Sequence, residues 1–134
     1  MTSALKYLPF GKHVALITDA RFSGVSTGAC IGHIGPEALA DGPIGKLQDG
    51  DLIQIIVDRN TLEGSLNFIG TTAQRLTSDE GAAVLTKRKC RADIAPNAAL
   101  PDETRLWAAL QQVGGGTWGG CVYDVPKIIA RLIG

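Results

Sequence analysis

The organisation of this chain follows from one stretch, Thr18-Asp19-Ala20-Arg21-Phe22-Ser23-Gly24-Val25-Ser26-Thr27-Gly28-Ala29-Cys30-Ile31-Gly32. The apolar run that precedes it, Val14-Ala15-Leu16-Ile17, is too short for a helix and predicts a buried strand. Glycines and polar residues then follow, and glycine is the residue at which a backbone adopts positive φ or approaches a ligand closely. A strand therefore ends in a polar loop, and strand ends are where open α/β sheets bind ligands.

Three hydroxyl groups lie within five residues of this loop, on Ser23, Ser26 and Thr27. Two interpretations are open from the residues alone: a catalytic or ligand-binding loop, and a plain tight turn beside a sheet. A membrane-helix contact through the spaced glycines is excluded, because no apolar run approaches the roughly 20 residues that a span requires. A nucleotide site is also excluded, since neither Gly-Lys-Ser/Thr nor G-x-G-x-x-G occurs in the loop.

Residues 18–24, 32–38 and 42–44 resemble the C-terminal domain of the dihydroxy-acid and phosphogluconate dehydratase family. The motif of that family reads Thr-Asp-Gly-Arg-Phe-Ser-Gly, then Gly-His-x-x-Pro-Glu-Ala, then Gly-Pro-Ile. This chain departs from it at Ala20, where most members have glycine. The later segment, Gly114-Gly115-Gly116-Thr117-Trp118-Gly119-Gly120-Cys121-Val122-Tyr123-Asp124, is similar to the tails of the sugar-acid branch, notably the xylonate dehydratases.

The resemblance implies a hydro-lyase that converts an aldonate such as xylonate or gluconate to a 2-keto-3-deoxy acid. Ser23 matches the serine that removes the C2 proton of the substrate. Ser26 and Thr27 match hydroxyl positions that contact the substrate, and Arg21 supplies positive potential near the serine. From the residues alone, an ion pair of Arg21 with Asp19 or another carboxylate is an equal alternative.

The resemblance also implies an iron–sulfur cluster, acting as a Lewis acid on the C3 hydroxyl, and a magnesium ion. Both are expected mainly in an N-terminal domain of the same protein, so this chain is expected to bind neither and to be inactive by itself. Cys30, Cys90 and Cys121 match none of the family's ligand cysteines and form no Cys-x-x-Cys pair. Cys30 and Cys121 are predicted to pack as small hydrophobic residues, and His33 to be a hydrogen-bonded structural residue rather than a catalytic one.

The 134 residues fit one domain, and the resemblance identifies residues 1–134 as the C-terminal domain of a longer enzyme. Thirteen basic and thirteen acidic residues leave no electrostatic footprint for nucleic acid or an anionic membrane. No signal peptide is visible and the cysteine count is odd, which favours reduced thiols in the cytoplasm. The expected partners are the N-terminal domain and a sugar-acid substrate, in a full-length homo-oligomer.

The order of elements predicts a mixed α/β fold, with early strands and late helices forming a compact mixed sheet or barrel. By resemblance this is a swivelling β/β/α domain like the small domain of aconitase. The predicted strands and helices are: strands 14–17, 29–34 and 52–57, the last buried on both faces and in a hairpin with 61–69; a helical turn at 36–40; and helices after the cap 77–80, at 102–112 and at 126–132. Residues 1–12 are expected to be irregular, residues 86–101 to be an exposed loop, and the basic run 87–89 to be solvated.

Two other classes of protein are compatible with the same residues. The chain could be a stand-alone small subunit that docks onto a cluster-bearing subunit, as in aconitase-like isomerases. It could also be a non-catalytic module that holds an anion in the glycine loop. The presence of Ser23 within a loop that otherwise follows the family motif favours the enzyme-derived domain.

Overall fold

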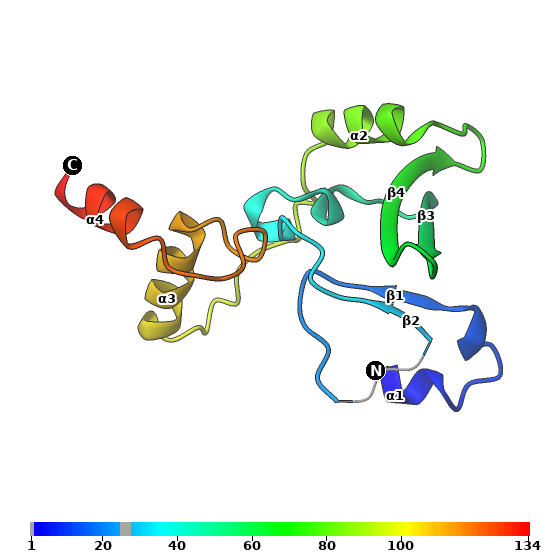
Figure 1. Ribbon diagram of the computed structural model, residues 1–134, viewed down its shortest axis with the longest axis horizontal. Helices are drawn as coiled ribbons and strands as arrows, with labels where there is room; N and C mark the ends of the chain where they lie inside the picture. The colour runs from blue at the N-terminus through cyan, green and yellow to red at the C-terminus, as the bar shows by residue number, and fades with distance from the viewer. Residues whose placement is uncertain (1, 25–27) are drawn as a thin grey trace.

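The computed structural model describes residues 2–24 and 28–134 and has a mixed α/β architecture (Figure 1). Helices and strands follow in the order α1 (Thr2–Leu5), β1 (Ala15–Ile17), β2 (Ala29–Ile31), β3 (Asp51–Asp58), β4 (Glu63–Thr71), α2 (Ser78–Lys87), α3 (Asp102–Val113) and α4 (Val125–Ile133). Three 3-10 turns, η1 (Gly11–His13), η2 (Ala38–Ala40) and η3 (Pro43–Lys46), connect them. The mixed class is confirmed. The single sheet or barrel is not, because the described strands form two separate two-stranded sheets.

The first sheet pairs β1 and β2 in parallel, with Leu16 opposite Cys30. Backbone hydrogen bonds continue this pairing beyond the strands, from the Thr18 amide to the Ile31 carbonyl at 3.0 Å and from the Ile34 amide to the Thr18 carbonyl at 3.2 Å. β1 confirms the strand predicted at 14–17, although its side chains are exposed or half-buried rather than buried. β2 ends earlier than predicted, and His33 beyond it has a φ of 57°, which extended backbone does not allow.

The second sheet is the predicted hairpin, in which β3 and β4 pair antiparallel with Ile55 opposite Leu66. The expectation that β3 is buried on both faces is wrong, since Ile56 is 48% and Val57 70% exposed. A two-stranded sheet has only the cover that neighbouring elements give it, and α2 lies along β4 (Figure 1). The apolar run thus identified a strand but not the number of its faces that are covered.

Helix α2 begins where the sequence predicts, at a capping box. The Thr77 hydroxyl accepts a hydrogen bond from the Glu80 amide at 3.3 Å, and the Glu80 carboxylate accepts one from the Thr77 amide at 2.8 Å. These bonds satisfy amides that the first turn of a helix leaves unpaired. The helix packs Leu85 near Phe68 of β4, and these two are the buried hydrophobic side chains of the described core.

The basic run at residues 87–89 is not exposed to solvent at every position. The guanidinium of Arg88 binds the Asp51 carboxylate at 2.5 Å, and the exposed fractions of the two side chains are 21% and 5%. The prediction for residues 87–89 is therefore wrong at Arg88, because the C-terminal end of α2 lies beside the start of β3. Lys87 and Lys89 are exposed, as predicted.

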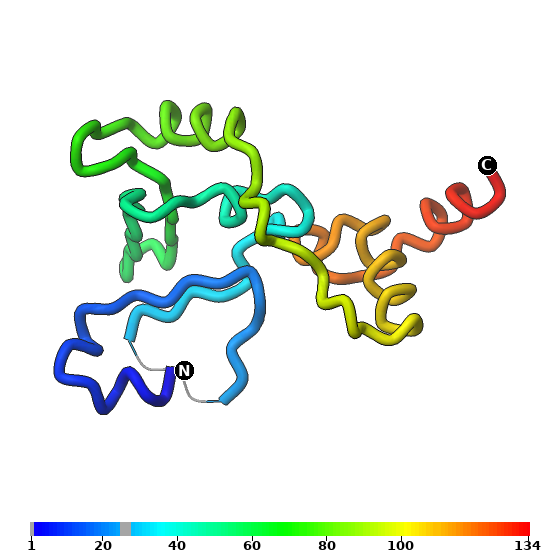
Figure 2. The backbone as a smooth tube through the Cα atoms, turned by 180° about the vertical axis from the view of Figure 1, so that it is seen from behind, coloured from blue at the N-terminus to red at the C-terminus, as the bar shows by residue number. Residues whose placement is uncertain are grey.

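The C-terminal helices lie to one side of the two sheets, as both views show (Figures 1 and 2). α3 and α4 confirm the two helices predicted at 102–112 and 126–132. Their apolar side chains are largely exposed, including Leu106, Trp107, Leu132 and Ile133. No helix in the described part of the chain is long and apolar enough to cross a membrane.

Two local predictions need correction. The N-terminal segment expected to be irregular contains the short helix α1. The helical turn expected at 36–40 with proline at its first position is the shorter turn η2, which begins at Ala38 after Glu37 as its N-cap residue. Pro36 therefore lies outside the turn, and Glu37 has extended backbone rather than helical backbone.

Candidate functional site

The loop that carries Ser23 leaves the C-terminal end of β1, as the sequence predicts, and Ser23 and Arg21 are both exposed on it. Ser26 and Thr27, the other two predicted substrate-binding residues, lie outside the described residues. The structure therefore shows the first part of the loop, which holds the serine that the resemblance implies is the base.

The start of this loop is held by backbone and side-chain hydrogen bonds. The Ala20 amide donates to the Thr18 hydroxyl at 3.1 Å, and the Ala20 carbonyl accepts from the His33 amide at 3.0 Å. A Cβ on Gly32 would lie 3.1 Å from the Ala20 carbonyl oxygen and 3.3 Å from the Phe22 ring. Glycine at position 32 thus lets the loop lie directly against the residues that follow β2.

Asp19 connects the loop to a distant turn. Its Oδ2 accepts a hydrogen bond from the Ala38 amide at 2.9 Å, at the start of η2. Asp19 is therefore engaged by a backbone amide and not by Arg21, which forms no ion pair with any residue that the structure describes. The geometry leaves the Arg21 guanidinium exposed to solvent on the same loop as Ser23.

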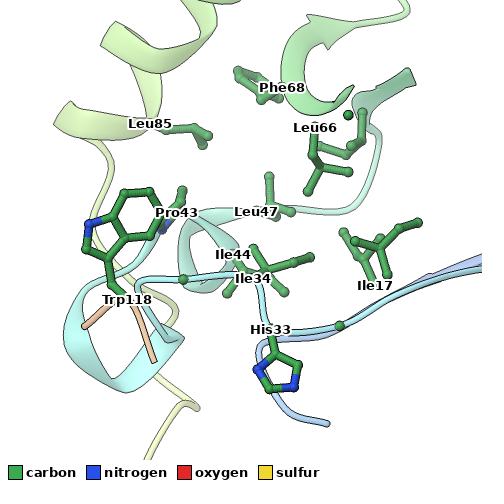
Figure 3. A pocket seen from close by; sticks show the side chains of 15 residues that line it. Ile17, His33, Ile34, Pro43, Ile44, Leu47, Leu66, Phe68, Leu85 and Trp118 are labelled. Carbon is green, nitrogen blue, oxygen red and sulfur yellow. The ribbon is translucent and has the colours of Figure 1, made fainter. Parts of the chain in front are cut away.

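His33 shapes the backbone beside this loop. Its amide bonds to Ala20, its φ is 57°, and its imidazole is exposed and points away from the cavity that lies behind it (Figure 3). The hydrogen bond at His33 is made by its backbone amide, so the structural role predicted for its side chain stays a prediction.

Sequence reasoning did not single out the contact between Glu37 and Thr117, which joins segments 80 residues apart. Glu37 Oε1 accepts a hydrogen bond from the Thr117 amide at 2.8 Å and a second, short one from the Thr117 hydroxyl. The contact joins two segments that separately resemble the family, 32–38 and 114–124. The glycines beside Thr117 were the available signal, because close backbone approach requires such residues.

The Glu37 carboxyl is ionised near neutral pH. Burial raises its pKa, but the hydrogen bonds from the Thr117 hydroxyl and amide outweigh burial and hold the pKa below its ordinary value. Its other oxygen, Oε2, is buried and has no hydrogen-bond partner among the described residues. Both hydrogen bonds from Thr117 reach the carboxylate through Oε1.

A cavity with a volume of about 450 Å³ lies between the two sheets (Figure 3). Aliphatic and aromatic side chains line it, including Ile17, Ile34, Leu47, Phe68 and Leu85, while Ser23 does not. Of the lining residues, only His33 and Trp118 carry polar side-chain atoms. A polyhydroxylated acid needs several hydrogen-bonding partners, so this apolar cavity does not suit a sugar acid.

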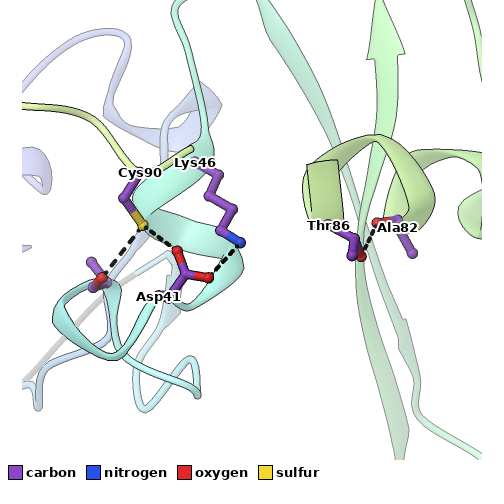
Figure 4. A network of polar contacts seen from close by, with 6 residues as sticks. Asp41, Lys46, Ala82, Thr86 and Cys90 are labelled. Atoms are coloured by element: carbon purple, nitrogen blue, oxygen red, sulfur yellow. Dashed lines mark hydrogen bonds and ion pairs between the residues drawn. The ribbon is translucent and has the colours of Figure 1, made fainter. Parts of the chain in front are cut away.

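The described residues offer no group of three or more His, Cys, Asp or Glu side chains that could hold a metal ion. The three cysteines are thiols, each half-buried. Cys90 donates to Asp41 Oδ1 at 3.3 Å, and Lys46 binds the other oxygen of Asp41 at 3.0 Å (Figure 4). Burial, followed by the Asp41 carboxylate, raises the pKa of the Cys90 thiol, which disfavours the thiolate that metals and electrophiles require.

Residues 1–102 match the family model described as dihydroxy-acid/6-phosphogluconate dehydratase C-terminal. The chain belongs to this family. It is 64% identical over 129 residues to D-xylonate dehydratase YagF of Escherichia coli (strain K12), an alignment that covers 96% of this chain and 20% of that protein. It is 62% identical over 134 residues to D-xylonate dehydratase YjhG of the same strain, covering 98% and 20%. Dihydroxy-acid dehydratase 2 of Bradyrhizobium diazoefficiens is 41% identical over 122 residues, covering 91% and 18%.

The chain thus spans about a fifth of the length of these dehydratases. No solved structure matches it. Family membership confirms the resemblance that the motifs around Ser23 and Glu37 predicted. The chain is more similar to the two relatives named as xylonate dehydratases than to the dihydroxy-acid dehydratase. This agrees with the similarity of residues 114–124 to the sugar-acid branch.

Proposed function

We propose that this chain is the catalytic-base domain of a dehydratase that converts a sugar acid, such as xylonate, to a 2-keto-3-deoxy acid. One observation carries the proposal: an exposed serine stands on a loop at the end of a strand, in a chain 64% identical to a D-xylonate dehydratase. The hydroxyl of Ser23 is accessible, and the loop that bears it is anchored through Asp19. A base needs both access to substrate and a fixed position.

The reaction removes one molecule of water from the substrate, as a proton from C2 and a hydroxide from C3. Ser23, as the alkoxide, takes the proton from C2 of the substrate, and the C2 electron pair forms a C2–C3 double bond as the C3–oxygen bond breaks. The hydroxide that leaves C3 takes the proton from the Ser23 hydroxyl and departs as water, which regenerates the alkoxide, and the resulting enol tautomerises to the 2-keto-3-deoxy acid. An alkoxide requires nearby positive charge, and Arg21 is a cation two residues away without a carboxylate partner among the described residues.

We assign substrate contacts to Arg21, Ser26 and Thr27, whose guanidinium and hydroxyl groups suit the carboxylate and hydroxyls of an aldonate. The proposed iron–sulfur cluster and magnesium ion belong to the rest of the protein. The described residues include no cluster of ligands that fits either group. The chain alone is accordingly expected to show no turnover.

The partner that we propose is the N-terminal part of the same protein. Exposed apolar side chains on the C-terminal helices, such as Trp107 and Leu132, support a surface that is covered in the whole enzyme. A cytoplasmic, homo-oligomeric enzyme with a swivelling C-terminal domain is the form that we propose. The three cysteines, all thiols, fit a reducing compartment.

The test is the substitution Ser23→Ala in the intact protein, with turnover of xylonate measured after metal content is matched to the wild type. Loss of the base should lower kcat by at least about 10²-fold. Ser65→Ala, at an exposed serine of β4, is the matched control and should retain wild-type turnover. A Ser23→Ala variant that keeps more than about a tenth of the turnover contradicts the proposal. A serine that only capped a turn would cost about 0.5–2 kcal/mol of stability and leave the chemistry intact.

A further inference from the structure

The Ser23 loop and the glycine-rich segment near the C-terminus attach to the same two adjacent residues. The amide of Ala38 donates to Asp19, four residues before Ser23, at 2.9 Å. The carboxylate of the preceding residue, Glu37, accepts the amide and hydroxyl hydrogens of Thr117. Residues 37 and 38 therefore lie between the loop that carries the proposed base and a segment about 80 positions further along the chain.

The backbone around Thr117 is built for this contact. Gly116 has a φ of 56°, a conformation that favours glycine, and a Cβ there would lie 3.1 Å from both carboxylate oxygens of Glu37. A Cβ on Gly35 would lie 3.4 Å from the Trp118 amide nitrogen. Gly116 thus lets this part of the chain approach the Glu37 carboxylate, while a Cβ on Gly35 would make only ordinary van der Waals contact with Trp118.

We propose that Thr117 is a positioning residue for Ser23, acting through Glu37, the Ala38 amide and Asp19. The proposal rests on the proposed function, in which Ser23 is the base. Both ends of the connection use carboxylate oxygens as acceptors, and hydrogen bonds to carboxylates are stronger than those between neutral groups. Without the Thr117 hydroxyl, the half-buried Glu37 carboxylate keeps only the hydrogen bond from the Thr117 amide. Its Oε2 has no hydrogen-bond partner among the described residues. Water then solvates the carboxylate better than the protein does, so the Glu37 side chain turns towards solvent. This movement shifts the adjoining backbone and separates the Ala38 amide from Asp19.

The first measurement is hydrogen–deuterium exchange in the intact protein with Thr117→Val, which keeps the shape of the side chain and removes the hydroxyl. We expect the Ala38 amide and the amides of residues 18–24 to exchange about tenfold faster or more, while the β3–β4 amides keep their protection. Thr117→Ser restores the hydroxyl and should restore the protection. Thr72→Val, at an exposed threonine after β4, is the matched control and should change neither region.

The second measurement is steady-state turnover of xylonate by the same variants. Misplacement of a base by a fraction of an ångström lowers the chemical step more than binding, so Thr117→Val should lower kcat about 10- to 10²-fold with KM changed less than about twofold. Thr117→Ser should recover most of the kcat. Glu37→Gln, which keeps an oxygen acceptor for Thr117 but removes the charge, should fall between the wild type and Thr117→Val in both measurements, and it serves as the test if Thr117→Val does not fold.

Unchanged exchange at Ala38 in Thr117→Val or Glu37→Gln would overturn the proposal, as would equal loss of protection in the β3–β4 hairpin. A kcat that Thr117→Ser does not recover would overturn it as well. Failure of the proposed function is seen separately, as turnover that survives Ser23→Ala, while the exchange measurement reports whether Thr117 holds the loop.

Discussion

The guanidinium of Arg88 lies over the ring of Phe68, 4.7 Å from its centroid. The same guanidinium reaches Asp51 with two nitrogens, Nη1 to Oδ2 at 2.5 Å and Nη2 to Oδ1 at 3.1 Å. Arg88 is the C-cap residue of α2, Asp51 begins β3, and Phe68 lies in β4. The Arg88 side chain therefore connects the helix to both strands of the hairpin. It forms an ion pair with the Asp51 carboxylate and a cation–π contact with the Phe68 ring.

We expect Arg88→Ala to destabilise the protein by about 3 kcal/mol, the lower end of the range for breaking a buried ion pair, because Arg88 keeps some exposure. The variant leaves Asp51, whose side chain is 5% exposed, without its cation. The measurement is urea denaturation of the wild type and the variant. Arg91→Ala, which breaks the exposed pair between Arg91 and Asp93, is the control and should cost no more than about 1 kcal/mol. Equal losses in the two variants would contradict the prediction.

The same carboxylate should make stability depend on pH in the acid range. Burial raises the pKa of Asp51, but hydrogen bonds from Arg88 and from the Gln48 amide outweigh burial and hold this pKa below its ordinary value. The unfolded chain then binds the proton more readily than the folded one, so stability rises with pH. The contribution is complete above the unfolded pKa of about 3.9 and is lost as pH falls through the folded pKa.

Comparison of the wild type with Asp51→Asn isolates this contribution from other carboxyls. Their free energies of unfolding should diverge most at about pH 6 and converge towards about pH 3. A constant difference across this range would show that the ionisation of Asp51 does not contribute.

The local elements of the fold were predictable because their signals are local. The Thr77 capping box, the hairpin after Asp58 and the helices near the C-terminus each depend on a few neighbouring residues. The burial of the side chains of those elements depends instead on which distant segments pack against them. An apolar run such as 52–57 therefore predicted a strand correctly and the burial of Val57 incorrectly. Arg88 was misjudged for the same reason, since Asp51 is 37 residues away in the sequence.

The candidate site divides in the same way. Its position at the end of β1 follows from the apolar run and the polar loop after it, and the roles of Ser23 and Arg21 remain predictions. The contacts that hold the loop are not local: Asp19 meets Ala38 across 19 residues, and Glu37 meets Thr117 across 80. Only their glycine neighbours, such as Gly116, indicate from the sequence that another part of the chain approaches closely, and at Gly116 this is the Glu37 carboxylate.

Gly81 in α2 should respond to substitution in the direction opposite to helix propensity. Gly81→Ala in a helix ordinarily stabilises by about 0.8–1 kcal/mol. Here a Cβ would lie 1.9 Å from the carbonyl oxygen of Phe68, so the helix must move off β4 and separate Leu85 from Phe68. Overpacking of this kind costs about 1–3 kcal/mol, which exceeds the propensity gain, and thermal melts should show net destabilisation by Gly81→Ala. Ala83→Gly, at an exposed position of the same helix, is the matched control and should cost about 1 kcal/mol through helix propensity alone. A Gly81→Ala variant more stable than the wild type would show that α2 does not pack this closely on β4.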